Sequence, residues 1–157
     1  MQRRSILLAA AAAAGFVPAA RAHHGWSGFD AERPIYLEGR AEKVEWRNPH
    51  VELVLALPPL PKLPADLAKR SVPAQSSPID GAAILAKAVL PKRADKRWEL
   101  EMAPLTRMQA WNVAEIKPGA ELSVVGYTFP GEKGEAVCRV EYLFIDGKVY
   151  GLRSAPA

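Results

Sequence analysis

The chain contains little cysteine and little histidine. One of its 157 residues is a cysteine and three are histidines. A single cysteine, Cys138, cannot form an intramolecular disulfide and does not supply a paired-cysteine zinc site. The sequence also lacks a nucleophile elbow and a phosphate-binding loop. These absences argue against the enzyme classes that such motifs identify. We expect Cys138 to be a small buried hydrophobic residue.

Acidic residues are missing from the first 22 positions, and no second long apolar run follows them. Arg3 and Arg4 precede an alanine-rich apolar run over residues 6–17, and Ala20-Arg21-Ala22 resembles a signal-peptidase site. The pattern predicts a signal peptide, residues 1–22, with cleavage near Ala22/His23. A membrane anchor is the alternative, but the run is shorter than the roughly 20 residues needed to span a bilayer.

The leader determines where the protein is found and much of its charge. We expect a periplasmic or secreted product without a membrane span after cleavage. The arginine pair is compatible with twin-arginine (Tat) export and with the ordinary Sec route. Removal of residues 1–22 takes away three arginines and lowers the formal net charge from +4 to +1. The main argument for nucleic-acid binding is thereby lost, and we expect none.

The mature chain, residues 23–157, is predicted to be one mainly β domain. A first strand is predicted over residues 34–47, because apolar residues alternate along it. The alternation switches to the other face near Glu42-Lys43, which indicates a β-bulge there, and Gly39 allows a bend beside it. Asn48-Pro49 ends this strand, and residues 51–57 form its antiparallel partner. Further strands are expected in the last third of the chain, at residues 98–102, 122–126, 138–144 and 148–152, with a helix at 104–113.

This order predicts a small OB-fold-like barrel of five to six strands, with one short helix between strands 3 and 4. A half-open meander with one helix is the alternative. Residues 58–96 interrupt the strand pattern with seven prolines and a net charge of +4. We interpret them as a Pro-rich basic insertion, partly disordered, with a short helix over residues 78–90 capped by Ser77.

The three histidines are the candidate metal ligands. Cleavage after Ala22 frees the α-amino group of His23, whose pKa near 7.7–8.0 makes it an accessible ligand. This amine and the His23 imidazole can chelate one ion, and His24 or His50 can add a nitrogen. Nitrogen-only sites favour copper among the divalent ions. Cleavage one residue earlier also permits copper, through the third-position imidazole of His24.

Aromatic and acidic side chains offer weaker candidates. Trp26, Phe29, Trp46 and Trp98 are expected to belong to the core or to cover a barrel end, with stacking on a base or a sugar as the alternative. The carboxylates mostly alternate with apolar residues along the predicted strands. We therefore interpret them as solvent-exposed strand faces.

Several of these motifs together resemble a known family. They are the histidine pair in His23-His24-Gly25-Trp26, the "L-x-G" strand Leu37-Glu38-Gly39, and the turn Trp46-Arg47-Asn48-Pro49-His50. They are similar to the exported bacterial family of domain of unknown function 6152, over residues 23–57 and 97–153. The resemblance implies an exported OB-like domain and no particular activity. It marks His23, His24, His50 and the turn residues Trp46, Asn48 and Pro49, whereas residues 58–96 replace an expected short link.

The sequence thus favours a non-enzymatic periplasmic binding protein, with copper as the candidate cofactor and a small ligand as the candidate partner. The alternative is a structural or interaction module of the cell envelope without a metal. Such a module would dock a protein through the barrel face or through residues 58–96. A copper-dependent redox enzyme is a third, less favoured hypothesis, since the sequence names no substrate.

Overall fold

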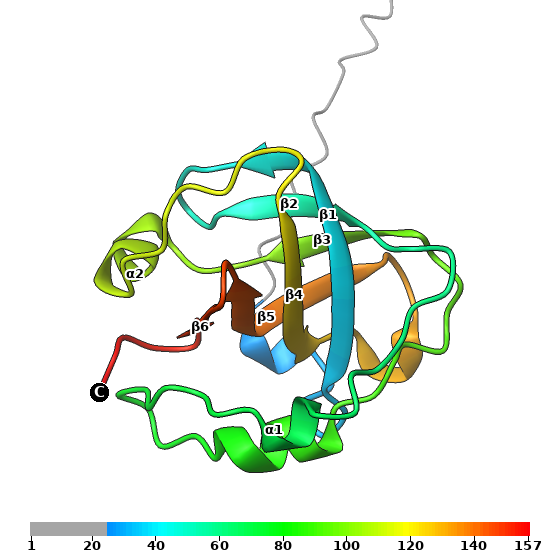
Figure 1. Cartoon of the computed structure of the whole chain (residues 1–157), viewed down its shortest axis with the longest axis horizontal. Coiled ribbons are helices and arrows are strands. Elements are labelled where there is room, and N and C mark those ends of the chain that lie inside the picture. Colours follow the sequence, from blue (N-terminus) through cyan, green and yellow to red (C-terminus); the bar gives the residue numbers. More distant parts are fainter. Residues whose placement is uncertain (1–24) are drawn as a thin grey trace, which may run out of the picture.

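The computed structural model of the chain describes residues 25–157 (Figure 1). The predicted signal peptide and the two histidines after it lie outside these residues. The elements follow one another in this order: η1 (Trp26–Gly28), β1 (Ile35–Glu45), β2 (Glu52–Ala56), η2 (Leu67–Lys69), α1 (Gly81–Lys87), β3 (Arg97–Glu101), α2 (Leu105–Ala110), β4 (Glu121–Tyr127), η3 (Pro130–Glu132), β5 (Val137–Ile145) and β6 (Lys148–Gly151).

Five strands close a barrel. β1 pairs with β2 and β4, β2 pairs with β3, and β4 pairs with β5, all antiparallel. A parallel ladder between β3 and β5 closes the ring, and β6 extends it beyond β5. Because α2 lies between β3 and β4, the order and closure are those of an OB-fold-like barrel. The predicted fold is confirmed, and the half-open meander is not what forms.

The long first strand bends where its sequence predicts. The register between β1 and β2 shifts between Ala41 and Lys43, which leaves Glu42 as the extra residue of a bulge. A Cβ atom at Gly39 would lie 2.1 Å from the carbonyl oxygen of Ala56. Only glycine therefore lets β1 approach the end of β2 so closely. The bend allows one strand to contribute to both sides of the barrel.

Alternating residues of the five strands fill the barrel with an apolar core. The fully buried side chains include Ile35, Leu37, Leu55, Trp98, Leu100, Met102, Met108, Val140 and Leu143. Cys138 also lies in this core, and burial raises the pKa of its thiol. The expectation for Cys138 as a small buried hydrophobic residue is confirmed.

Residues 58–96 pack along the outside of the barrel, in teal to green at its right side and below it in Figure 1. The backbone of Val89 bonds on both sides to β1, accepting from Tyr36 N at 2.8 Å and donating to Pro34 O at 3.1 Å. Leu67, Leu85 and Ala88 cover the outward aromatic rings of Tyr36 and Tyr142. Partial disorder was expected here, whereas these non-local contacts order the segment against β1, β4 and β5.

The helix inside this segment begins later than expected. α1 starts at Gly81, and the Asp80 carboxylate caps it by accepting a hydrogen bond from Ala83 N at 3.0 Å. The predicted cap, Ser77, instead donates its backbone N–H to Ser154 Oγ at 3.0 Å. Pro78 lies between the two residues, so the helix begins at the first good capping residue after the proline.

Candidate functional site

The turn between β1 and β2 carries four of the predicted site residues. Trp46 is half-buried against the main core, and the Asn48–Pro49 peptide bond is cis. The Asn48 side chain accepts a hydrogen bond from Leu105 N at 3.1 Å, which attaches the turn to the start of α2. His50 is half-buried directly after the turn. The motif therefore places His50 at the end of the barrel that α2 covers.

The first described residues are held against the barrel by Trp26. The Arg153 guanidinium lies 4.2 Å from the centroid of its indole ring, and that of Arg139 lies 5.0 Å away. Tyr127 meets the same ring edge-on, with 6.3 Å between centroids. Two cations on one indole make a stronger attachment than apolar packing alone. The chain thus enters the fold where β4 ends and β5 begins.

A single row of paired residues connects this entry point with the His50 turn. Glu45 pairs with Glu52, Glu52 with Glu101, and Glu101 with Arg139. Arg139 and Glu52 are therefore two strands apart, about 10 Å at the usual strand spacing. His50 precedes Glu52 by two residues.

The structure therefore places His50, but it does not describe His23 and His24, the other two predicted ligands. Within residues 25–157, no group of three or more His, Cys, Asp or Glu side chains is placed to hold a metal ion. A complete site would need ligands from outside the described residues.

Two buried carboxylates lie beside the entry point. Glu141 is fully buried, and it accepts hydrogen bonds from Gln75 Nε2 at 2.9 Å and Arg153 Nε at 2.7 Å. Glu101 is buried next to Arg139, with 3.5 Å between Oε2 and Nη1. Burial lowers the pKa of Arg139, and the nearby Glu101 opposes that shift. The interpretation of the carboxylates as solvent-exposed faces was wrong for these two, which pair with the buried Arg139 and the half-buried Arg153.

Some of the aromatic residues belong to the barrel core, and others cover the outside of the barrel. Trp98 is fully buried, Trp46 packs on the core, and Phe29 stacks on Phe129 with 5.1 Å between ring centroids. Trp26 covers the two arginines described above. These positions agree with the prediction of core and covering roles rather than a stacking platform.

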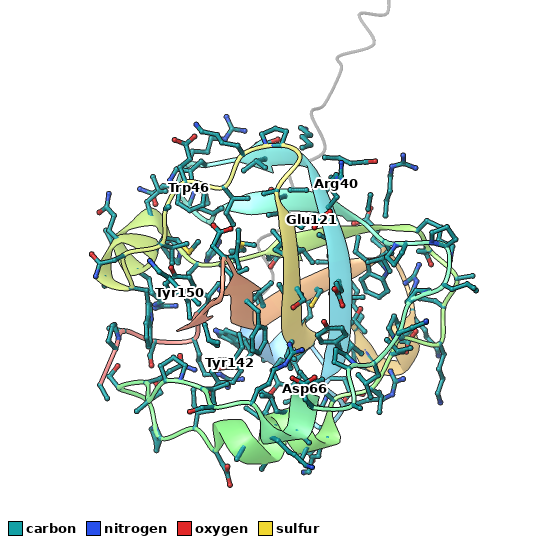
Figure 2. All side chains as sticks on the ribbon, viewed as in Figure 1. Arg40, Trp46, Asp66, Glu121, Tyr142 and Tyr150 are labelled. Carbon is teal, nitrogen blue, oxygen red and sulfur yellow. The ribbon has the colours of Figure 1, made fainter. Side chains whose placement is uncertain are left out.

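One surface depression was not predicted from the sequence. It is a groove of about 700 Å³ on the outside of β1 and β4, next to the β5–β6 hairpin. Glu38, Ser123, Phe144 and Val149 follow one another across the four strands and lie along it. In Figure 2, Arg40 and Glu121 lie near one end of this sheet face, and Tyr142 and Asp66, a residue of the insertion, lie toward the other end. The groove forms only when strands that are distant in sequence pair with one another, so no local sequence motif predicts it.

Comparison with known proteins gives one match. No curated protein and no solved structure shows a significant match to the chain. Among the described helices, none is both long and apolar enough to cross a membrane. Residues 10–59 match the model described as "Family of unknown function (DUF6152)". Over this segment, which contains the histidine pair and the Trp46–His50 turn, the predicted resemblance to that family is confirmed.

Proposed function

We propose that the protein is an exported, periplasmic, non-enzymatic β-barrel binding protein that takes up copper(II) at its mature N-terminus. Signal cleavage before His23 supplies a free amine next to an imidazole, and the two form a chelate with one ion. His24 and His50 are the further nitrogen donors. Such a nitrogen-rich set favours copper over the other divalent first-row metals.

The observation that carries this proposal is the attachment of Trp26. This residue follows His24 by two positions, and it lies against Arg139 and Arg153. Arg139 belongs to the same row of paired residues as Glu52, two residues from His50. The chain leading back from Trp26 therefore starts within a few residues' reach of the His50 turn. Glu101 and Glu141 balance the two arginines, which reduces their repulsion of a metal cation.

Copper titration of the exported protein tests the proposal. Mass spectrometry first establishes the mature N-terminus, and electron paramagnetic resonance then follows Cu(II) added to the metal-free protein. We expect nitrogen hyperfine structure and a dissociation constant below about 1 μM. With cleavage before His23, His23→Ala abolishes this signal, whereas Glu135→Gln, an exposed change on another loop, leaves it unchanged.

Two further variants separate the ligands. His50→Ala and Trp26→Ala should each change the hyperfine pattern without eliminating copper binding. His50→Ala removes a nitrogen donor, and Trp26→Ala releases the segment that brings the N-terminal amine close to His50. If cleavage leaves Ala22 as the first residue, His24→Ala becomes the disruptive change. Affinity weaker than micromolar, or a spectrum that none of the histidine variants alters, would contradict the copper proposal.

One observation favours a second candidate, an envelope interaction module. Within residues 58–64, Leu60 is 80% exposed and Leu63 is 42% exposed, in a stretch with four prolines. Exposed apolar side chains on a Pro-rich segment are typical of a docking motif. The double change Leu60→Ser and Leu63→Ser should abolish cross-linking to one envelope protein while the fold and copper binding persist. Unchanged cross-linking would remove this candidate.

A further inference from the structure

The groove on β1 and β4 exists because the insertion covers only part of an outer sheet face. Tyr36, Val125 and Tyr142 form one row across β1, β4 and β5, and residues 67–88 bury it. The neighbouring row runs through Glu38, Ser123, Phe144 and Val149, and it remains open. The open row thus forms a floor between the insertion and the β5–β6 hairpin. Its volume, about 700 Å³, is in the range of small-molecule sites.

Apolar side chains make up much of this floor. Phe144 and Val149 are half-buried, and Leu57, directly after β2, also lines the groove. The groove is therefore not merely a gap between charged surface residues. A ligand with an apolar body of one ring would remove this surface from water, and this is the main favourable contribution for a small molecule.

Three of the six charged residues that line the groove already have ion-pair partners. Arg40 pairs with Glu121 at 3.0 Å. Arg70 donates two hydrogen bonds to the Asp66 carboxylate, at 3.0 and 3.2 Å, and its guanidinium lies 5.5 Å from the Phe144 centroid. These two arginines are thus largely neutralised, and the groove offers little free positive charge from them.

The remaining charges are mainly negative. Within residues 25–157, Glu38, Asp146 and Lys148 line the groove without forming an ion pair. Glu38 accepts a hydrogen bond from the Tyr36 hydroxyl at 2.7 Å, which fixes one of its oxygens. With Arg40 paired to Glu121 and Arg70 paired to Asp66, two carboxylates against one ammonium leave an excess of one negative charge around the groove.

We propose that this groove binds a small amphipathic organic cation, a protonated amine that carries an apolar group. The apolar group lies on Phe144 and Val149, and the ammonium donates to the Glu38 carboxylate. Lys148 disfavours a doubly charged ligand at the outer end, and Asp146 adds long-range attraction. This site is separate from Trp26 and His50, neither of which lines the groove.

Three probes with the same ring and different charges test the proposal: 2-phenylethylamine, 2-phenylethanol and phenylacetate. Backbone NMR shifts of the whole mature protein report where each one binds. We expect 2-phenylethylamine to shift Glu38, Ser123 and Phe144 saturably, with a dissociation constant of about 1 mM or lower. The neutral alcohol should bind more weakly, and phenylacetate should bind least.

Charge-removing variants identify the group that recognises the amine. Glu38→Gln keeps an acceptor for Tyr36 and should weaken amine binding about tenfold, the usual effect of losing a charged hydrogen bond. Asp146→Asn, which tolerates the positive φ of 51° at that turn position, should weaken it less. Lys148→Gln should strengthen amine binding slightly, and Glu135→Gln is the control.

Specific outcomes would overturn the assignment. Phenylacetate binding as tightly as the amine would show that the free negative charge does not select the ligand. Amine binding that is unchanged in both Glu38→Gln and Asp146→Asn, with each variant folded by its thermal transition, would remove the recognition role. Absence of saturable shifts at the groove for the amine would remove the site.

Discussion

Among single residues, Glu132 shows most clearly how the insertion is attached. Its carboxylate is 7% exposed and accepts hydrogen bonds from Lys92 N and Arg93 N, each at 2.9 Å. It also pairs with Arg33, which leads into β1. Burial raises the pKa of this carboxyl, but these hydrogen bonds and the Arg33 charge outweigh it, and the net pKa is lowered. The ionised form therefore stabilises the fold.

We expect Glu132→Gln to lower the free energy of unfolding by about 1–2 kcal/mol at neutral pH. Because the folded pKa lies below the ordinary value of 4.5, the contribution is fully present above that value and is lost as the pH falls through the folded pKa. Urea unfolding at a series of pH values should therefore show the difference between wild type and variant shrinking in acid. A difference that stays constant in acid, or that Glu135→Gln reproduces, would contradict this role.

Individual site residues could be predicted only where the signal is local. The placement of Asn48 and His50 around a turn follows from the proline between them. The burial of Glu101 and Glu141 could not be predicted, because their partners Arg139 and Arg153 come close only through strand pairing. Alternation in a strand indicates which side a residue faces, and it does not indicate whether another segment covers that side.

At the scale of elements, β1 is the strand on which the barrel depends. The change of apolar phase near Glu42 predicted its bulge, and the bulge is found at that residue. Strand order and the position of α2 were also predictable, since alternation and turn residues are local. The path of residues 58–96 was not, because Val89 and Glu132 fix it through contacts with distant parts of the chain.

Gly39→Ala tests the close approach of β1 and β2. The added Cβ would lie 2.1 Å from a backbone oxygen, that of Ala56, which cannot move without disturbing β2. We expect a loss of about 3 kcal/mol in the free energy of unfolding, measured by urea denaturation. At Gly25, a Cβ would meet nothing nearer than 4.0 Å, so Gly25→Ala should be nearly neutral. Similar stabilities for the two variants would refute the steric argument.

At the scale of the whole molecule, residues 58–96 pack against the barrel over several of their side chains. Leu67, Leu85 and Ala88 bury the outer rings of Tyr36 and Tyr142, which would otherwise lie on the barrel surface. Gln75 reaches Glu141, and its backbone pairs with Pro156. The insertion thereby connects β1, β5 and the residues after β6.

Two leucines of this segment provide a matched comparison. Leu85 is 1% exposed against the barrel, whereas Leu60 is 80% exposed. Leu85→Ala should lower the free energy of unfolding by about 2–4 kcal/mol, and Leu60→Ala should leave it nearly unchanged.

Deletion of residues 58–96 should reduce the cooperativity of thermal unfolding. A deletion variant as stable and cooperative as wild type would show that the barrel does not need the segment.

The parallel ladder between β3 and β5 also sets the order of events during synthesis. Glu99 pairs with Val137, and Ile35 pairs with Gly126, so both pairings that complete the ring join residues far apart in sequence. Chains with such non-local pairings fold in milliseconds to seconds, since the intervening loops must first be brought together. The ring therefore cannot close in a nascent chain until β4 and β5 have been made. For the proposed export, this delay gives an unfolded-chain translocon time to engage the leader, whereas a folded-protein route would have to wait for closure.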